Sequence, residues 1–269
     1  MVLKLNIKDF TVDSTSKKPA ASNLYLYAIA SVNENQEPIS FHGIEEQPID
    51  LVPYKDIMLV VSNLSKKKVR PERKNVAVHH AVLNHLMKHN TSMLPIRFGM
   101  IADNRKEVQR LLTINYDMLH TKLKMMAGRV EMGVSLSWDV PNIFEYLLNR
   151  HSQLRETRDK LLANPAHEPS RDEKIEIGAL FSQILDEERE VYTDTILSLL
   201  SPVCCDVVKS TYRNDTEIMN IFCLISAARR DEFEEKIIEA STILDDNFVI
   251  KYTGPWPPHN FSKLNLSLE

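Results

Sequence analysis

Residues 130–138 read Val-Glu-Met-Gly-Val-Ser-Leu-Ser-Trp, an unbroken alternation of large apolar residues with small or charged ones. Side chains along a β-strand point in turn to opposite faces of the sheet, so one face of this strand is buried and the other is polar. The stretch therefore predicts the strand that opens a second domain. Glu131, Gly133, Ser135 and Ser137 are expected on its polar face.

The residues that follow this strand carry helical patterns. Two stretches, 142–162 and 172–200, are separated by a breaker with two prolines at 164–169. Leucines recur at a spacing of seven residues in the first stretch, at positions Leu147, Leu154 and Leu161. This spacing is typical of helices that pack along one another, so an antiparallel helical hairpin is expected at about 142–200.

The segments after the hairpin complete the domain. Two strands are expected at 203–210 and 218–226, then a helix at 231–244 opened by Asp231 and Glu234, and a last strand at 247–252. The order strand, helices, strand, strand, helix, strand is the ferredoxin-like βαββαβ pattern, with the hairpin enlarging its first crossover. We therefore predict a ferredoxin-like domain at 128–269.

The first half reads as a separate α+β domain at 24–127, so the fold class is α+β with two domains. Strands are expected at 24–30, 56–64 and 93–98, and a helix at 75–89. Asn104 and Glu107 are spaced as a capping box that opens a second, long helix, and Gly128 is placed to end it. Residues 1–23 are small and polar enough to predict a flexible leader.

The end of the chain, residues 251–261, reads Lys-Tyr-Thr-Gly-Pro-Trp-Pro-Pro-His-Asn-Phe. Gly254 permits a turn, and three prolines fix φ and remove amide donors, so the strand is expected to stop and leave as a stiff proline-rich arm within the tail 253–269. Two readings stay open. The aromatic residues could cover the core of their own domain, or the arm could bind a partner through Trp256, Pro257, Pro258 and Phe261.

Composition excludes several classes of protein. In 269 residues the formal net charge is -4, which gives no overall attraction to nucleic acid or to an anionic membrane. The 3 cysteines, two of them adjacent, do not make a disulfide framework, and no run approaches the roughly 20 apolar residues of a membrane helix. A cytosolic protein is expected.

Candidate chemical sites are few. His79, His80, His85 and His89 share one expected helix, and the last two are spaced to meet one metal ion, but surface imidazoles are the favoured reading. The basic run at 66–74 could bind phosphate or an acidic partner, although a solvated loop is favoured because no aromatic residues interleave. Arg97, a charge within an apolar run, could bind an anion, although a tie between the two domains through a carboxylate or carbonyl group is favoured.

No nucleophile elbow, phosphate-binding loop or dinucleotide fingerprint occurs in the sequence, so no catalytic residue and no cofactor is predicted.

Five segments, in this order along the chain, resemble the gas vesicle protein F/L family. They are Leu51-Val52-Pro53-Tyr54, His79-His80-Ala81-Val82-Leu83, Leu94-Pro95-Ile96-Arg97-Phe98-Gly99, Gly128-Arg129-Val130-Glu131 with Trp138-Asp139, and the tail at 251–261. The tail is similar to the family's C-terminal signature, with His259 where a tyrosine is usual. The resemblance spans about residues 24 to 261.

This resemblance implies a non-enzymatic accessory or minor structural protein of gas vesicles, the organelles of buoyancy. It implies binding to the hydrophobic main shell protein (GvpA) and to other assembly proteins, and a location at the gas vesicle, with a cytoplasmic stage before assembly. No nucleic-acid or lipid-membrane partner is implied. The alternative from the residues themselves is a small-molecule-binding regulatory protein built on a ferredoxin-like domain.

Overall fold

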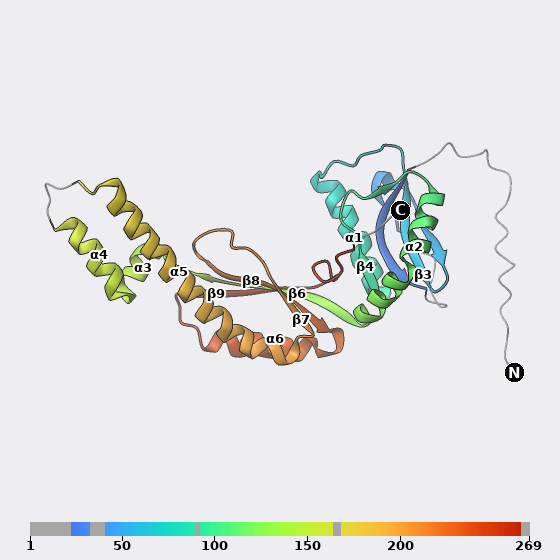
Figure 1. Ribbon diagram of the computed structural model, residues 1–269. Helices are drawn as coiled ribbons and strands as arrows, with labels where there is room; N and C mark the ends of the chain where they lie inside the picture. The colour runs from blue at the N-terminus through green and yellow to red at the C-terminus, as the bar shows by residue number, and fades with distance from the viewer. Residues whose placement is uncertain (1–22, 33–40, 90–91, 164–167, 265–269) are drawn as a thin grey trace, which may run out of the picture.

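The computed structural model describes residues 23–32, 41–89, 92–163 and 168–264. The predicted leader lies outside this part apart from Asn23, as do the last five residues of the tail. The molecule is elongated (Figure 1): one α/β unit lies at the N-terminal end, a second sheet follows it, and helices of the second half extend away at the opposite end.

The first sheet has five strands in the order β2-β3-β1-β4, with β5 also beside β1, and all pairs are antiparallel. The strands are β1 Asn23–Ser31, β2 Ile49–Tyr54, β3 Ile57–Leu64, β4 Met93–Pro95 and β5 Ile101–Ala102. Helix α1 (Arg73–His89) packs on one face and α2 (Arg105–Met126) on the other. The near-continuous apolar runs of β1 and β3 follow from this burial on both faces.

The predicted ends of α2 are confirmed. The Asn104 side chain accepts hydrogen bonds from the backbone N–H groups of Lys106 and Glu107, at 3.0 Å each. Gly128 follows the C-cap with φ +65°, a conformation that glycine adopts without strain. Strands β2 and β5 and the short 3-10 helix η1 (Ile44–Glu46) were not predicted.

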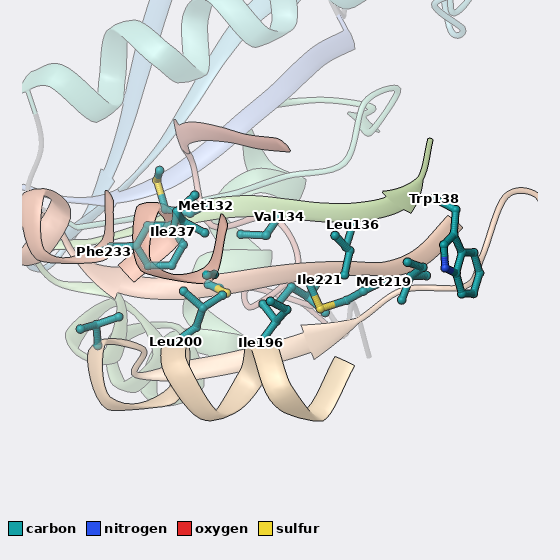
Figure 2. Packing of buried hydrophobic residues seen from close by; sticks show 14 of the residues in the cluster. Met132, Val134, Leu136, Trp138, Ile196, Leu200, Met219, Ile221, Phe233 and Ile237 are labelled. Carbon is teal, nitrogen blue, oxygen red and sulfur yellow. The ribbon is translucent and has the colours of Figure 1, made fainter. Parts of the chain in front are cut away.

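The second sheet has four strands in the order β7-β8-β6-β9, again all antiparallel. They are β6 Arg129–Trp138, β7 Asp206–Lys209, β8 Glu217–Ser226 and β9 Phe248–Trp256. Figure 2 shows Met132, Val134 and Leu136 of β6 facing side chains of α5 (Arg171–Leu200) and α6 (Arg230–Thr242), which close the core of this half. The apolar side chains of residues 130–138 therefore lie in the core, as their alternation predicts.

Four local expectations were wrong. The stretch 142–162 is two helices, α3 (Ile143–Arg150) and α4 (Ser152–Leu162), because His151 between them has an extended backbone with ψ +110°. Helix α6 starts at Arg230, with no side-chain cap from Asp231. The strand expected from residue 203 begins only at Asp206, because residues 201–203 form the 3-10 helix η2 (Ser201–Val203). A further 3-10 helix, η3 (Ala227–Arg229), precedes α6.

The fourth correction concerns the tail. Strand β9 does not stop at Tyr252 but continues through Gly254 and Pro255 to Trp256, which lies opposite Glu131 of β6. The irregularity that the glycine and proline introduce is absorbed as a register shift between Glu131 and Gly133, not as a strand end. The proline-rich arm therefore does not begin where the sequence suggested.

Candidate functional site

After β9 the tail returns to the first half of the molecule. Pro257 and Pro258 are buried, and Phe261 and Leu264 pack against the hydrophobic cluster beneath α2. That cluster also includes Leu224 of β8, so it is shared by the two halves. In Figure 1 the tail leads from the second sheet to the first unit. We call residues 257–264 the clasp.

Gly254 makes this path possible. Its φ of +122° is one that residues with a side chain rarely adopt. A Cβ atom at this position would lie 2.8 Å from Met132 Sδ and 2.9 Å from the Glu131 carbonyl oxygen. Only glycine lets β9 cross so close to β6 here, and this close approach aims the chain toward the first unit.

Glu131 fastens the clasp. Its carboxylate accepts hydrogen bonds from the backbone N–H of Asn260 at 2.8 Å and from Asn260 Nδ2 at 2.7 Å. The side chain is only 3% exposed, and this burial raises the pKa of the carboxyl group, against the two hydrogen bonds, which lower it. The expectation that Glu131 lies on an open polar face was wrong, because the clasp covers it.

The histidines of α1 line the same region. His79 is 1% exposed, and its Nδ1 is 3.0 Å from the hydroxyl oxygen of Tyr25. The ring of the neighbouring His80 lies 5.9 Å from that of His259 in the clasp. Burial lowers the pKa of both His79 and His259 to about 4. Surface imidazole was thus the wrong reading for His79, which is a core residue.

The other predicted chemistry of these histidines is a metal site. His85 and His89 do lie together, with ring centroids 4.6 Å apart. Within the ranges that the structure describes, however, no three side chains of His, Cys, Asp or Glu are arranged to hold a metal ion. His85 and His89 are therefore two neighbouring imidazole rings without a third possible metal ligand among the described residues.

Arg97 is exposed and, among the described residues, its guanidinium forms neither an ion pair nor a hydrogen bond. The structure therefore does not place the expected tie between the halves at Arg97. The clasp supplies contacts between the halves instead, together with Leu224 of β8 and Met87 of α1. The sequence holds no signal for this, because Glu131 and Asn260 are 129 positions apart.

The predicted tail residues have different surroundings. Pro257 and Pro258 are inside and Phe261 is half-buried, whereas Trp256 is 43% exposed and its Nε1 donates to Thr253 Oγ1 at 3.2 Å. Tyr252 is also 43% exposed. Both residues belong to β9, which pairs with β6 alone among the described strands. We call the free side of this strand, with its two aromatic side chains, the β9 edge.

The helices of the second half offer a second exposed apolar surface. Leu162 at the end of α4 is 64% exposed, and Ile175 in the first turns of α5 is 57% exposed. A contact of 2.9 Å between His151 Nε2 and Glu188 Oε1 joins the break between α3 and α4 to α5. In the part of the chain that the structure describes, no helix is long and apolar enough to cross a membrane.

Comparison with known proteins agrees with this architecture. The family model for the gas vesicle synthesis protein GvpL/GvpF matches residues 23–263, which include both units and all of the clasp except its last residue. The chain belongs to this family. The GvpL/GvpF match thus spans all of the described strands and helices.

Individual relatives are similar over almost their full length. Gas vesicle protein F of Dolichospermum flosaquae is 24% identical over 90% of this chain and 98% of the relative. Gas vesicle protein F2 of Halobacterium salinarum is 26% identical over 92% of this chain and 95% of the relative.

A solved structure supports the fold itself. The crystal structure of the gas vesicle protein GvpF from Anabaena sp. PCC7120 matches with a TM-score of 0.78, at 23% identity. The match covers 91% of this chain and 97% of that one. The mixed α/β fold with two antiparallel sheets is therefore the fold of this GvpF.

Proposed function

We propose that this protein is a non-enzymatic accessory or minor structural component that acts in gas vesicle assembly. By this proposal it binds the main shell protein and other assembly proteins, first in the cytoplasm and then at the vesicle. Membership of the GvpL/GvpF family supports the assembly role. The finer statements rest on the surfaces described above.

We also propose that residues 128–269 form a ferredoxin-like domain and residues 24–127 a separate α+β domain. The elements of the second half follow in the order strand, helices, strand, strand, helix, strand. The strand order β7-β8-β6-β9 places the first and third strands of this half at the centre, as that pattern requires.

The β9 edge is the observation that carries the binding proposal. An edge strand presents unpaired backbone N–H and C=O groups, which an extended segment of another protein can pair with. Tyr252 and Trp256 flank these groups with about 43% of their surface exposed, and aromatic side chains are the commonest anchors of protein interfaces. A shell protein in its unassembled state would be shielded there from pairing with itself.

Co-purification with co-expressed main shell protein tests this proposal. The double variant Tyr252→Ala, Trp256→Ala should lose most of the shell protein that the wild type retains. Met100→Ala is the matched control, because Met100 is also 43% exposed but lies in the first unit. The proposal fails if the folded double variant retains as much shell protein as the control does.

The exposed residues of α4 and α5 provide the second proposed contact. An apolar helix of the shell protein could be masked by Leu162 and Ile175. We expect Leu162→Lys with Ile175→Lys to weaken retention of the shell protein without lowering the melting temperature. Equal retention would assign these two residues no part in binding.

A further inference from the structure

Charge is distributed very unevenly between the two halves of this chain. Residues 1–127 contain 18 Lys and Arg against 12 Asp and Glu, a net charge of +6, whereas residues 128–269 contain 15 against 25, a net charge of -10. The formal net charge of -4 conceals this polarity. An elongated molecule with opposite charges on its two halves attracts the unlike half of a second copy.

The positive charge is most concentrated at residues 66–74, which we call the basic segment. It joins β3 to α1 and holds six cations and one acid. Lys74 lies 3.7 Å from Glu46. The other five are all exposed, and among the described residues their side chains have neither an ion pair nor a hydrogen bond: Lys66, Lys67, Lys68, Arg70 and Arg73.

The local structure does not compensate this charge. The first turn of α1 contains no acidic residue. A helix N-terminus carries a partial positive charge, so Arg73 and Lys74 at the start of α1 are electrostatically unfavourable there. An anionic surface brought by a partner would relieve this repulsion.

The outer face of α6 has the complementary character. The helix buries Phe233, Ile237 and Ala240. Opposite them, at helical spacing, the face exposed to solvent consists of Asp231, Glu235, Ile238 and Thr242.

Two isoleucines are conspicuous on and just beyond this face. Ile238 is 63% exposed and Ile243 is 53% exposed, so the face is apolar as well as acidic. Among the described residues, the side chains of Asp231, Glu235 and Asp246 form neither ion pairs nor hydrogen bonds.

The cations of α6, and Arg229 just before it, are by contrast already paired with carboxylates of this helix. The ion pairs are Arg229 with Glu232 at 2.7 Å, Arg230 with Glu234 at 2.9 Å and Lys236 with Glu239 at 2.6 Å. The charge left for a partner to neutralise is therefore negative.

We propose that copies of this chain associate head to tail, with the basic segment of one copy on the outer face of α6 of the next. In Figure 1 the start of α1 and helix α6 lie on different halves of the elongated molecule. The pair then keeps one free surface of each kind, a basic segment on one copy and an α6 face on the other. Such a heterologous contact repeats, so the product is a row of copies whose length depends on concentration.

Two charge-reversed variants test this inference by sedimentation velocity. The segment variant carries Lys66→Glu and Lys68→Glu, and the helix variant carries Glu235→Lys and Asp246→Lys. The wild type should form dimers and larger species at low ionic strength and become monomeric as salt is added. Each variant alone should associate far more weakly than the wild type, because the segment substitutions lower the net charge of residues 66–74 from +5 to +1 and the helix substitutions reverse two of the unpaired acids.

Mixing the two variants is the decisive step. The carboxylates introduced into one variant lie opposite the ammonium groups introduced into the other, and the unchanged surfaces also fit, so an equimolar mixture should associate more strongly than either variant alone. The control carries Lys106→Glu and Arg110→Glu on α2, which changes the net charge as much as the segment variant does, and it should associate more than that variant.

Three results would overturn the proposal. They are a wild type that is monomeric at low salt and high concentration, a mixture of variants that stays monomeric, and an assembly that nuclease treatment dissolves. Circular dichroism and melting temperatures of each variant establish that a loss of association is not a loss of folding.

Discussion

At the scale of single residues, Glu131 does the most to hold the clasp in place. Its carboxylate satisfies two N–H donors of Asn260 in a site that is almost closed to water. Buried donors that lose their acceptor lose the hydrogen bonds that water gave them in the unfolded chain. Removing the carboxylate therefore costs more free energy, through the donors left without an acceptor, than the two hydrogen bonds contribute by themselves.

Removing this acceptor should destabilise the protein. We expect Glu131→Ala to lower the free energy of unfolding by about 1–3 kcal/mol, because two partly buried N–H groups of Asn260 lose their acceptor. Urea denaturation followed by circular dichroism measures the change. Glu176→Ala, at an exposed position of α5, should change it by less than about 0.5 kcal/mol. Equal effects of the two substitutions would contradict the role assigned to Glu131.

His79 makes the stability depend on pH. Its folded pKa of about 4 lies below the ordinary value of 6.5. Between these two pH values the unfolded chain is protonated at His79, whereas the folded protein is not. The contribution of His79 is complete above pH 6.5, falls as the pH drops from 6.5 to 4, and amounts to at most about 3 kcal/mol. His259 acts in the same direction, while Glu131, whose folded pKa is raised, acts in the opposite one.

The variant His79→Gln should weaken this dependence. Glutamine does not titrate and can still hydrogen-bond to Tyr25, so the loss of stability between pH 6.5 and 4.5 should be smaller than in the wild type. His42→Gln, at an exposed position outside this helix, is the control and should leave the pH profile like that of the wild type. If the free energy of unfolding depended on pH in the same way in all three proteins, the folded structure would not lower the pKa of His79.

The sequence could identify neither of these residues as buried. Glu131 sits on the polar side of a strictly alternating strand, and His79 is one of four histidines in a helix. Their burial comes from the tail and from Tyr25 and Tyr27, which a periodicity cannot show. Local patterns report which face a side chain is on, but not whether a distant segment covers that face.

At the scale of elements, periodicity correctly predicted most of the helices and strands but often misplaced their ends. The alternating strand and the two helices that flank the first sheet were predicted because their patterns are long. The ends of β9 and α6 were wrong, since Pro255 can remain in an edge strand and Asp231 lies inside its helix instead of at the cap.

Two glycines allow a paired test of the bend in β9. Gly254→Ala should cost about 1–3 kcal/mol, because a side chain is strained at φ +122° and meets Met132. Gly178→Ala in α5, where an added Cβ meets nothing within 4 Å, should instead stabilise by about 0.5–1 kcal/mol. Thermal unfolding of both variants gives the two signs, and stabilisation by both would disprove the strained geometry at Gly254.

At the scale of the whole molecule, the clasp makes the two halves one structure. Phe261 and Leu264 lie on a cluster to which α2, the first sheet and Leu224 of β8 all contribute. Neither half closes this cluster alone. The cluster of the first half thus extends across the boundary near residue 128 that the sequence suggests, through Leu224, Phe261 and Leu264.

Loosening the clasp should separate the halves thermodynamically. Phe261→Ala removes apolar burial worth about 2 kcal/mol from the shared cluster and leaves both sheets intact. We expect calorimetry to resolve two unfolding transitions in this variant where the wild type has one. A single transition that shifts without splitting would mean that Leu224 and the remaining contacts suffice to couple the halves.

The path of the clasp also has a consequence for biosynthesis. Residues 24–126 leave the ribosome long before residues 257–264 are translated, yet part of their core is completed only by Phe261 and Leu264. The apolar surface beneath α2 therefore stays partly exposed to solvent until the second half has been synthesised. A nascent chain stalled in the second half would display that surface to chaperones and proteases, so the cell can distinguish finished from unfinished copies.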